Sequence, residues 1–164
     1  MIIETERLEL VLLSIEQLRL WIEDIQAFEK GLNCIYRGEP LEGFMLEIIK
    51  HQYEIAKKDL DNYFWHSFFV FKRKKDNVIV GSADFKTSPN ENGEVEIGYG
   101  LGKDFEHQGY MMEAVKGMCQ WALNQHEVKN VIAETEVDNL PSQNVLKRCG
   151  FKIYLEKETL WWIL

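Results

Sequence analysis

One turn of the chain, between a strand-like run and an amphipathic helix, constrains the fold more than any other feature. The run from Val95 to Leu101 has an apolar residue at every second position. The segment Glu106-His107-Gln108-Gly109-Tyr110 then leads into the helix. A glycine turn that enters a helix directly leaves several backbone N–H groups free, near the positive end of the helix dipole. Such a turn predicts a site for an anion such as a pyrophosphate.

The N-terminal part of the chain has the pattern of one strand and two helices. Ser14 is a suitable N-cap, with Gln17 at the capping-box position. Gly31 and Pro40 are typical of irregular structure. The elements that we predict are a strand at Arg7–Leu13, a helix at Ile15–Ile25, an irregular segment at Ala27–Pro40 and a helix at Leu41–Asp59.

The remainder of the chain alternates strands and helices. The predicted elements are strands at Trp65–Phe71, Val78–Phe85 and Glu94–Leu101, a helix after Gly109, a strand at Asn130–Val137, a short helix through Cys149, and a final strand pair at Phe151–Glu156 and Leu160–Leu164. We find no repeat or linker, so residues 1–164 are expected to form a single domain. The order predicts an α/β fold with a mixed central β-sheet flanked by helices.

The composition narrows the class of protein. With 164 residues, 46% of them hydrophobic, the chain is long enough for one globular domain. A formal net charge of −8 argues against a nucleic-acid partner, which needs a basic surface. There is no leader-like segment and no apolar run of about 20 residues, so we expect a cytoplasmic protein with no membrane partner. The cysteines and histidines lack ligand spacing, so no metal is expected.

A second motif lies downstream of the glycine turn. It has Asn139, then Ser142 three residues later, and it ends in Gly150-Phe151. Together with the Gly-Tyr-x-x-Glu-Ala run from Gly109 to Ala114, it resembles the two acyl-coenzyme A-binding motifs of the GNAT N-acetyltransferase superfamily. The branch that looks closest contains the ribosomal-protein N-terminal acetyltransferases. The opening Glu4-Thr5-Glu6-Arg7-Leu8 is also similar to the first strand of that branch.

The resemblance implies a GNAT-like acyl-CoA N-acyltransferase fold, with acetyl-coenzyme A (acetyl-CoA) as co-substrate. In that layout the strand that ends at Leu101 diverges from the strand Asn130–Val137, and the pantetheine arm of the cofactor lies in the gap. The residues implied to bind the cofactor, several of them through the backbone, are Tyr99, Leu101, Gln108, Gly109, Tyr110, Met111, Met112, Asn139 and Ser142. The alternatives are core packing for the Tyr99 and Leu101 side chains and helix capping for Asn139.

Two positions depart from the pattern of the superfamily. Glu106 stands where Gln or Arg is usual, and a carboxylate near a pyrophosphate is unfavourable unless it points to solvent. Met111 stands where Gly or Ala is common, but only its backbone must face the phosphates. We therefore expect cofactor binding to be retained, with an affinity below that of a full motif.

The strand Glu94–Leu101 offers two carboxylates as a general base for the acceptor amine. Glu94 and Glu96 share one face, opposite Val95 and Ile97. If the apolar pair packs under the cofactor-side helix, Glu96 faces the acceptor and can take the amine proton directly or through a water. The alternative is a solvated pair of strand carboxylates, which we favour for Glu94.

The general acid that protonates the leaving thiolate is often a tyrosine in the second motif of the superfamily. The corresponding residue here is Leu146, which cannot donate a proton. Ser142 is the best remaining hydroxyl, and its alternative role is to bond the backbone in the first turn of the helix. A thiolate needs little assistance near neutral pH, since a free thiol has a pKa of roughly 8.5.

The function predicted from the sequence is transfer of an acetyl group from acetyl-CoA to an amine. The acceptor is either a protein N-terminus or a small-molecule amine, and the chain acts as a monomer or a homodimer. The alternative is an acyl-CoA-binding module that no longer catalyses, which the changes at Leu146 and Glu106 permit.

Overall fold

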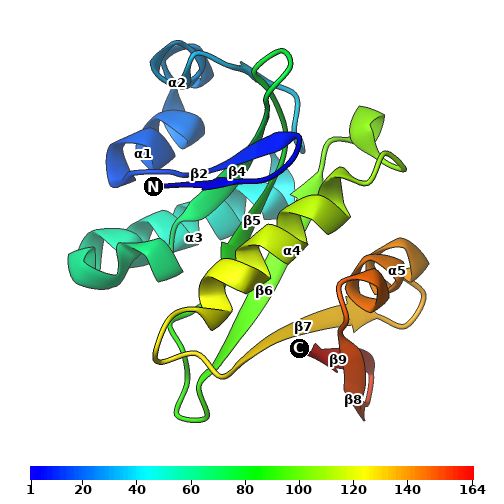
Figure 1. The fold of residues 1–164 in the computed structure, drawn as a ribbon. Coiled ribbons are helices and arrows are strands. Elements are labelled where there is room, and N and C mark those ends of the chain that lie inside the picture. Colours follow the sequence, from blue (N-terminus) through cyan, green and yellow to red (C-terminus); the bar gives the residue numbers. More distant parts are fainter.

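In the computed structural model, which describes residues 1–164, a nine-stranded mixed sheet carries helices on both faces (Figure 1). Across the sheet the strands run β1 (Ile2–Glu4), β2 (Leu8–Leu12), β4 (Phe68–Arg73), β5 (Val78–Phe85), β6 (Glu94–Leu101), β7 (Asn130–Glu136), β9 (Thr159–Ile163) and β8 (Lys152–Glu156). The short β3 (Ile35–Tyr36) pairs with β5 off this path. Neighbours along the path are antiparallel except β6 and β7, which are parallel.

The helices divide between the two faces of the sheet, as the ribbon in Figure 1 shows. One face carries α1 (Ile15–Glu23), α2 (Ile25–Leu32) and α3 (Gly43–Lys58), and the other carries α4 (Tyr110–Leu123) and α5 (Leu140–Arg148). Short 3-10 turns follow α3 at Leu60–Trp65 and precede α4 at Lys103–Phe105. None of these helices has both the length and the apolar character that crossing a bilayer requires.

Alternation along the strands builds a separate hydrophobic core on each face. In β4, Phe68 and Val70 pack with Trp21 of α1 and the other residues of the core under α1, α2 and α3. Phe69 and Phe71 point the other way, into the core under α4. Because successive strand residues face opposite sides, one apolar run in the sequence supports both layers.

The predicted elements are present, with one wrong segment and two missed strands in the N-terminal part. The fold class, a mixed sheet flanked by helices, is confirmed. The irregular segment predicted from Ala27 to Pro40 is wrong in its first part, because α2 extends to Leu32. Asp24 caps this helix by accepting a hydrogen bond from the Ala27 N–H, and Phe28 is buried beneath it. Gly31, which we took as a breaker, lies in its last turn. The strands β1 and β3 were not predicted.

The parallel strands β6 and β7 are joined at one end only. Their register runs from Glu94 opposite Asn130 to Glu96 opposite Ile132, and no pairing follows toward Leu101. On its other edge β6 stays paired with β5 as far as Leu101. The sheet therefore opens into a gap at the carboxyl end of β6, beside the start of α4 (Figure 1).

Candidate active site

The free edge of β6 carries the backbone groups of Tyr99 and Leu101. On the β5 side, Glu96 O accepts a hydrogen bond from Lys86 N at 2.9 Å, and Gly102 N donates to Val80 O at 2.7 Å. Backbone groups of an antiparallel strand alternate between its two edges, so the odd-numbered residues of β6 face the gap. The two residues predicted from the sequence thus present unpaired N–H and C=O groups to a strand-like ligand.

The glycine turn has the geometry of an anion site. Gly109 is the N-cap of α4, with φ at +81°, in the left-handed region that favours glycine. The first bond of the helix runs from Glu113 N to Gly109 O at 3.1 Å. The N–H groups of Tyr110, Met111 and Met112 consequently have no partner within the helix.

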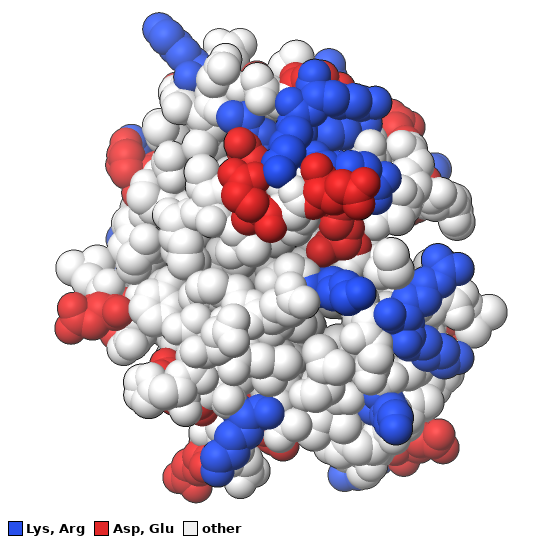
Figure 2. Space-filling model, in the orientation of Figure 1, with Lys and Arg blue, Asp and Glu red and all other residues white.

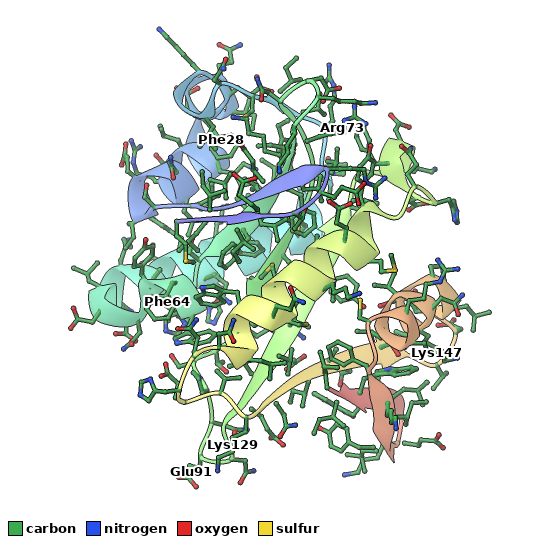
Figure 3. The ribbon with its side chains drawn as sticks, in the orientation of Figure 1. Phe28, Phe64, Arg73, Glu91, Lys129 and Lys147 are labelled. Carbon is green, nitrogen blue, oxygen red and sulfur yellow. The ribbon has the colours of Figure 1, made fainter.

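Arg7 holds this turn in place, a role that the sequence did not reveal. Its guanidinium donates to Gln108 O at 2.8 Å and to the Glu113 carboxylate at 2.7 Å. The guanidinium also stacks 4.3 Å from the centre of the Tyr110 ring. Arg73, which lies beside the start of α4 in Figure 3, donates to the Tyr110 hydroxyl at 3.2 Å. The Tyr110 side chain is therefore part of the scaffold, and only its N–H is free for a ligand.

Basic side chains lie near the turn and along α5, with carboxylates among them near the start of α4. Glu106 is exposed to solvent, the arrangement that limits its repulsion of a phosphate. Figure 2 shows basic side chains beside α4 and over α5, and Figure 3 labels one of them, Lys147. Local positive charge of this kind attracts a phosphate group over a range of several ångströms.

The start of α5 joins the second motif to β6. Asn139 caps the helix by accepting a bond from Ser142 N at 3.3 Å, which is the alternative role left open for it. The Ser142 hydroxyl lies 2.7 Å from the Tyr99 hydroxyl. Burial raises the pKa of Tyr99 to about 12, so its phenol stays protonated at neutral pH. Leu146 is fully buried and lines no site.

A pocket of about 940 Å³ lies on the opposite face, between α3 and strands β5, β6 and β7. Its polar lining is dominated by carboxylates, with Lys86 the only lysine or arginine among them. The acidic residues are Glu39, Glu47, Asp84, Glu134 and Glu136. The exposed Phe44 lies at the pocket as well. Chemically the pocket is suited to a cation.

The two carboxylates predicted on β6 have different surroundings. Glu94 accepts a hydrogen bond from Asn90 Nδ2 at 3.0 Å and stabilises the turn before the strand. Glu96 is less exposed, with 20% of its side chain accessible, and the Lys86 ammonium pairs with it. Val95 and Ile97 are buried in the core under α4, so Glu96 faces the α3 side as predicted.

The acidic pocket contains residues that the sequence analysis missed. Asp84 interrupts an otherwise apolar strand pattern in β5, and that interruption was the available signal. Gln52 of α3 and Glu39 of the segment before α3 lie with it in the pocket, far away in the sequence. No short motif connects these positions.

Comparison with known proteins identifies the family. Residues 13–152 match the family model described as an acetyltransferase (GNAT) domain, which covers most of the chain. The chain belongs to the GNAT acetyltransferase family. Membership makes it an N-acetyltransferase with acetyl-CoA as co-substrate, as predicted from the two motifs.

Individual GNAT proteins extend this match over nearly the whole chain. An uncharacterised N-acetyltransferase of Bacillus subtilis (strain 168), YjdG, is 34% identical over 151 residues, covering 92% of this chain and 89% of its own. The solved structure of RimL, a ribosomal L7/L12 α-N-protein acetyltransferase in complex with coenzyme A, superimposes with a TM-score of 0.72 at 16% identity, covering 100% and 97% of the two chains. The enzyme from Salmonella typhimurium that modifies the N-terminal serine of L7/L12 gives a TM-score of 0.69 at 17% identity, with coverage of 100% and 98%.

Proposed function

We propose that this GNAT enzyme transfers the acetyl group of acetyl-CoA to a cationic amine bound in the carboxylate-lined pocket. The observation that carries the proposal is the gap between β6 and β7. On one side of the sheet it adjoins the free amides of the glycine turn and the Ser142 hydroxyl. On the other side it adjoins the acidic pocket, so the donor and the acceptor can meet through it.

The residues present fit the donor. The N–H groups of Tyr110, Met111 and Met112, with Gly109 allowing close approach, would hold the pyrophosphate. The gap-facing backbone of Tyr99 and Leu101 would bond the pantetheine arm as a neighbouring strand would. Gln108 would contribute its backbone N–H, because its carbonyl accepts from Arg7 and its side chain donates to Asp104 O at 3.1 Å. Acetyl-CoA supplies an acetyl thioester that is already activated.

We assign the leaving-group side to Ser142, with Tyr99 behind it. A hydroxyl at Ser142 can donate to the departing sulfur and be resupplied with a proton by the Tyr99 phenol, 2.7 Å away. The buried phenol is protonated at neutral pH, so it holds a proton for this transfer. Asn139 supports this pair by capping α5 and so fixing the Ser142 backbone.

A carboxylate on the α3 side would take the proton of the acceptor. Glu96 is the residue that the strand pattern predicted, and it faces this side beside Lys86. Removing its charge tests whether it acts as a base or as the partner of Lys86. The same surface of negative charge attracts an ammonium group and disfavours acceptors with a carboxylate near the amine.

Release of free thiol from acetyl-CoA tests the function. The panel contains n-butylamine, 1,4-diaminobutane, a short peptide with a free N-terminus, and glycine as an acceptor with an adjacent carboxylate. We expect turnover with cationic amines and little with glycine. The relative kcat/KM of the peptide and of 1,4-diaminobutane decides between a protein N-terminus, which is the acceptor that the RimL description names, and a small diamine. Coenzyme A binding without thiol release for any amine would overturn the proposal.

A further inference from the structure

Asp84 is a buried carboxylate to which only one other residue donates a hydrogen bond. The residue is 6% exposed and lines the acidic pocket. Its Oδ2 accepts a hydrogen bond from Gln52 Nε2 at 3.0 Å, while Oδ1 accepts none from any other residue. A Cβ on Gly98 would lie 3.0 Å from this Oδ1. The carboxylate thus lies directly over the strand that borders the gap, in space that only a glycine leaves open.

Gln52 provides a second unused acceptor beside it. Its Nε2 also donates to Lys86 O at 3.1 Å, so reversing the amide would set Oε1 against two oxygens. The orientation is therefore fixed by its partners. Gln52 is 4% exposed and lines the pocket, and its Oε1 has no donor in the protein. A buried acceptor without a partner costs free energy, which a donor brought by a ligand would recover.

Glu96 lacks this freedom. The Lys86 ammonium pairs with its carboxylate, so accepting a proton there would remove the charge that Lys86 needs. Asp84, by contrast, is held by a neutral amide and can take a proton without breaking an ion pair. Compared with Glu96, Asp84 is therefore the better placed to exchange a proton with a ligand.

Building on the proposed function, we infer that Asp84 and Gln52 bind the ammonium group of the acceptor and that Asp84 removes its proton. The proton moves from R–NH3+ to Oδ1 of Asp84, which leaves a neutral amine. The nitrogen lone pair forms the N–C bond to the acetyl carbon, and the C–S bond breaks with its electron pair going to sulfur. Sulfur takes one proton from the Ser142 side, and the nitrogen loses a second proton as the amide forms. Of the two protons that the nitrogen has lost, one restores the Ser142 side and the other leaves to solvent through Asp84.

The charges around Asp84 favour this exchange near neutral pH. Burial raises its pKa to about 6, and the charge of Glu96 adds to the rise. The bond from Gln52, the charge of Lys86 and the backbone N–H of Asp84 itself oppose it. The titratable groups that line the same pocket are His51 and Glu47 on α3, Glu39 before α3, Lys86 after β5, Tyr99 on β6, and Glu134 and Glu136 on β7. Glu96 does not line the pocket but pairs with Lys86. A base of this pKa is ionised at pH 7 and still able to accept a proton.

The test is the pH dependence of kcat/KM for Asp84→Asn with n-butylamine, or with whichever amine of the panel the wild type acetylates fastest. We expect a loss of about 100-fold at pH 7, the low end of general-base effects, that shrinks as the pH approaches the pKa of the amine. The variant depends on pre-existing free amine, whereas the wild type uses the ammonium form. A loss of equal size at every pH would mean a purely structural role and would overturn the inference.

Glu96→Gln is the matched control on the same face of the sheet. We expect a smaller loss than for Asp84→Asn, and the reverse order would assign the proton to Glu96.

Calorimetry of n-butylammonium binding to the coenzyme A-loaded protein gives a readout that needs no turnover. Asp84→Asn should weaken this binding about ten-fold, about 1.4 kcal/mol. Unchanged binding would refute the inference that Asp84 and Gln52 bind the ammonium group. A wild type that releases no thiol with any amine would instead count against the proposed function.

Discussion

The two sides of the gap between β6 and β7 are built in different ways. The cofactor side consists largely of backbone groups from contiguous runs, the free edge of β6 and the first turn of α4. The acceptor side consists of side chains from four separate parts of the chain, Glu39, Gln52, Asp84 and Glu134 among them. A backbone site tolerates side-chain changes such as Glu106 and Met111, whereas a side-chain site changes its ligand with each substitution. The donor is thus set by the fold and the acceptor by individual residues.

The largest effect that would break this comparison is expected at Gly109. Gly109→Val puts a β-branched residue at a φ of +81°, with Arg7 Nη2 only 3.2 Å from the new Cβ. Either the turn rearranges or the amides move, so coenzyme A affinity measured by calorimetry should fall about 100-fold or more.

Gly43→Val is the control for backbone strain. Gly43 also begins a helix at positive φ, +55°, but it lies on the acceptor side, and a Cβ there meets nothing within 4 Å. Its coenzyme A affinity should stay near that of the wild type. Equal losses in the two variants would show that strain, and not the position of the amides, controls cofactor binding.

The next effect is expected at Ser142, where a side chain serves the cofactor side. Ser142→Ala should lower kcat by roughly ten-fold, because a thiolate leaves readily even without an acid. Coenzyme A affinity should change little, since the hydroxyl acts mainly in the transition state. Tyr99→Phe, which keeps the ring, should give a smaller loss in the same direction. A drop in affinity proportional to the drop in kcat would make Ser142 a binding residue.

The last prediction concerns the stability of the fold and tests the acceptor side alone. The folded-state pKa of Asp84 is raised to about 6, above that of the unfolded chain, so the folded protein binds more protons between about pH 4 and pH 6. The contribution of this group to stability is therefore lost as pH rises through that window. Asp84→Asn should unfold at the same temperature as the wild type at pH 4. At pH 8 its free energy of unfolding should be up to about 3 kcal/mol higher than that of the wild type. Calorimetric scans at the two pH values measure this difference.

If the stability difference between Asp84→Asn and the wild type were the same at both pH values, ionising Asp84 would not destabilise the folded protein. The expected result has the opposite implication. A carboxylate that destabilises the fold at neutral pH is one that the fold alone does not require, which agrees with a role in binding or catalysis.

The sequence predicted the strand, the glycine turn and the helix on the cofactor side because local rules govern them. A strand, a glycine turn and a helix are consecutive, so the turn at Gly109 followed from residue order alone. The missed parts depend on long-range contacts. Arg7 reaches the turn across more than 100 positions of sequence, and Gln52 meets Asp84 only once α3 packs on the sheet. The helix at Ile25–Leu32 depends on local signals of opposite sign. The cap at Asp24 favours it, and Gly31, which disfavours a helix, lies in its last turn and does not prevent it.

The unpaired edge of β6 has a consequence for the protein before it binds its donor. An open strand edge inside a sheet is a template for pairing with any extended chain, including a second copy of the same protein. A ligand that occupies this edge competes with such pairing and stabilises the native state by mass action. Resistance to aggregation in this enzyme should therefore follow the supply of coenzyme A, so that the metabolic state of its surroundings also sets how long the folded protein lasts.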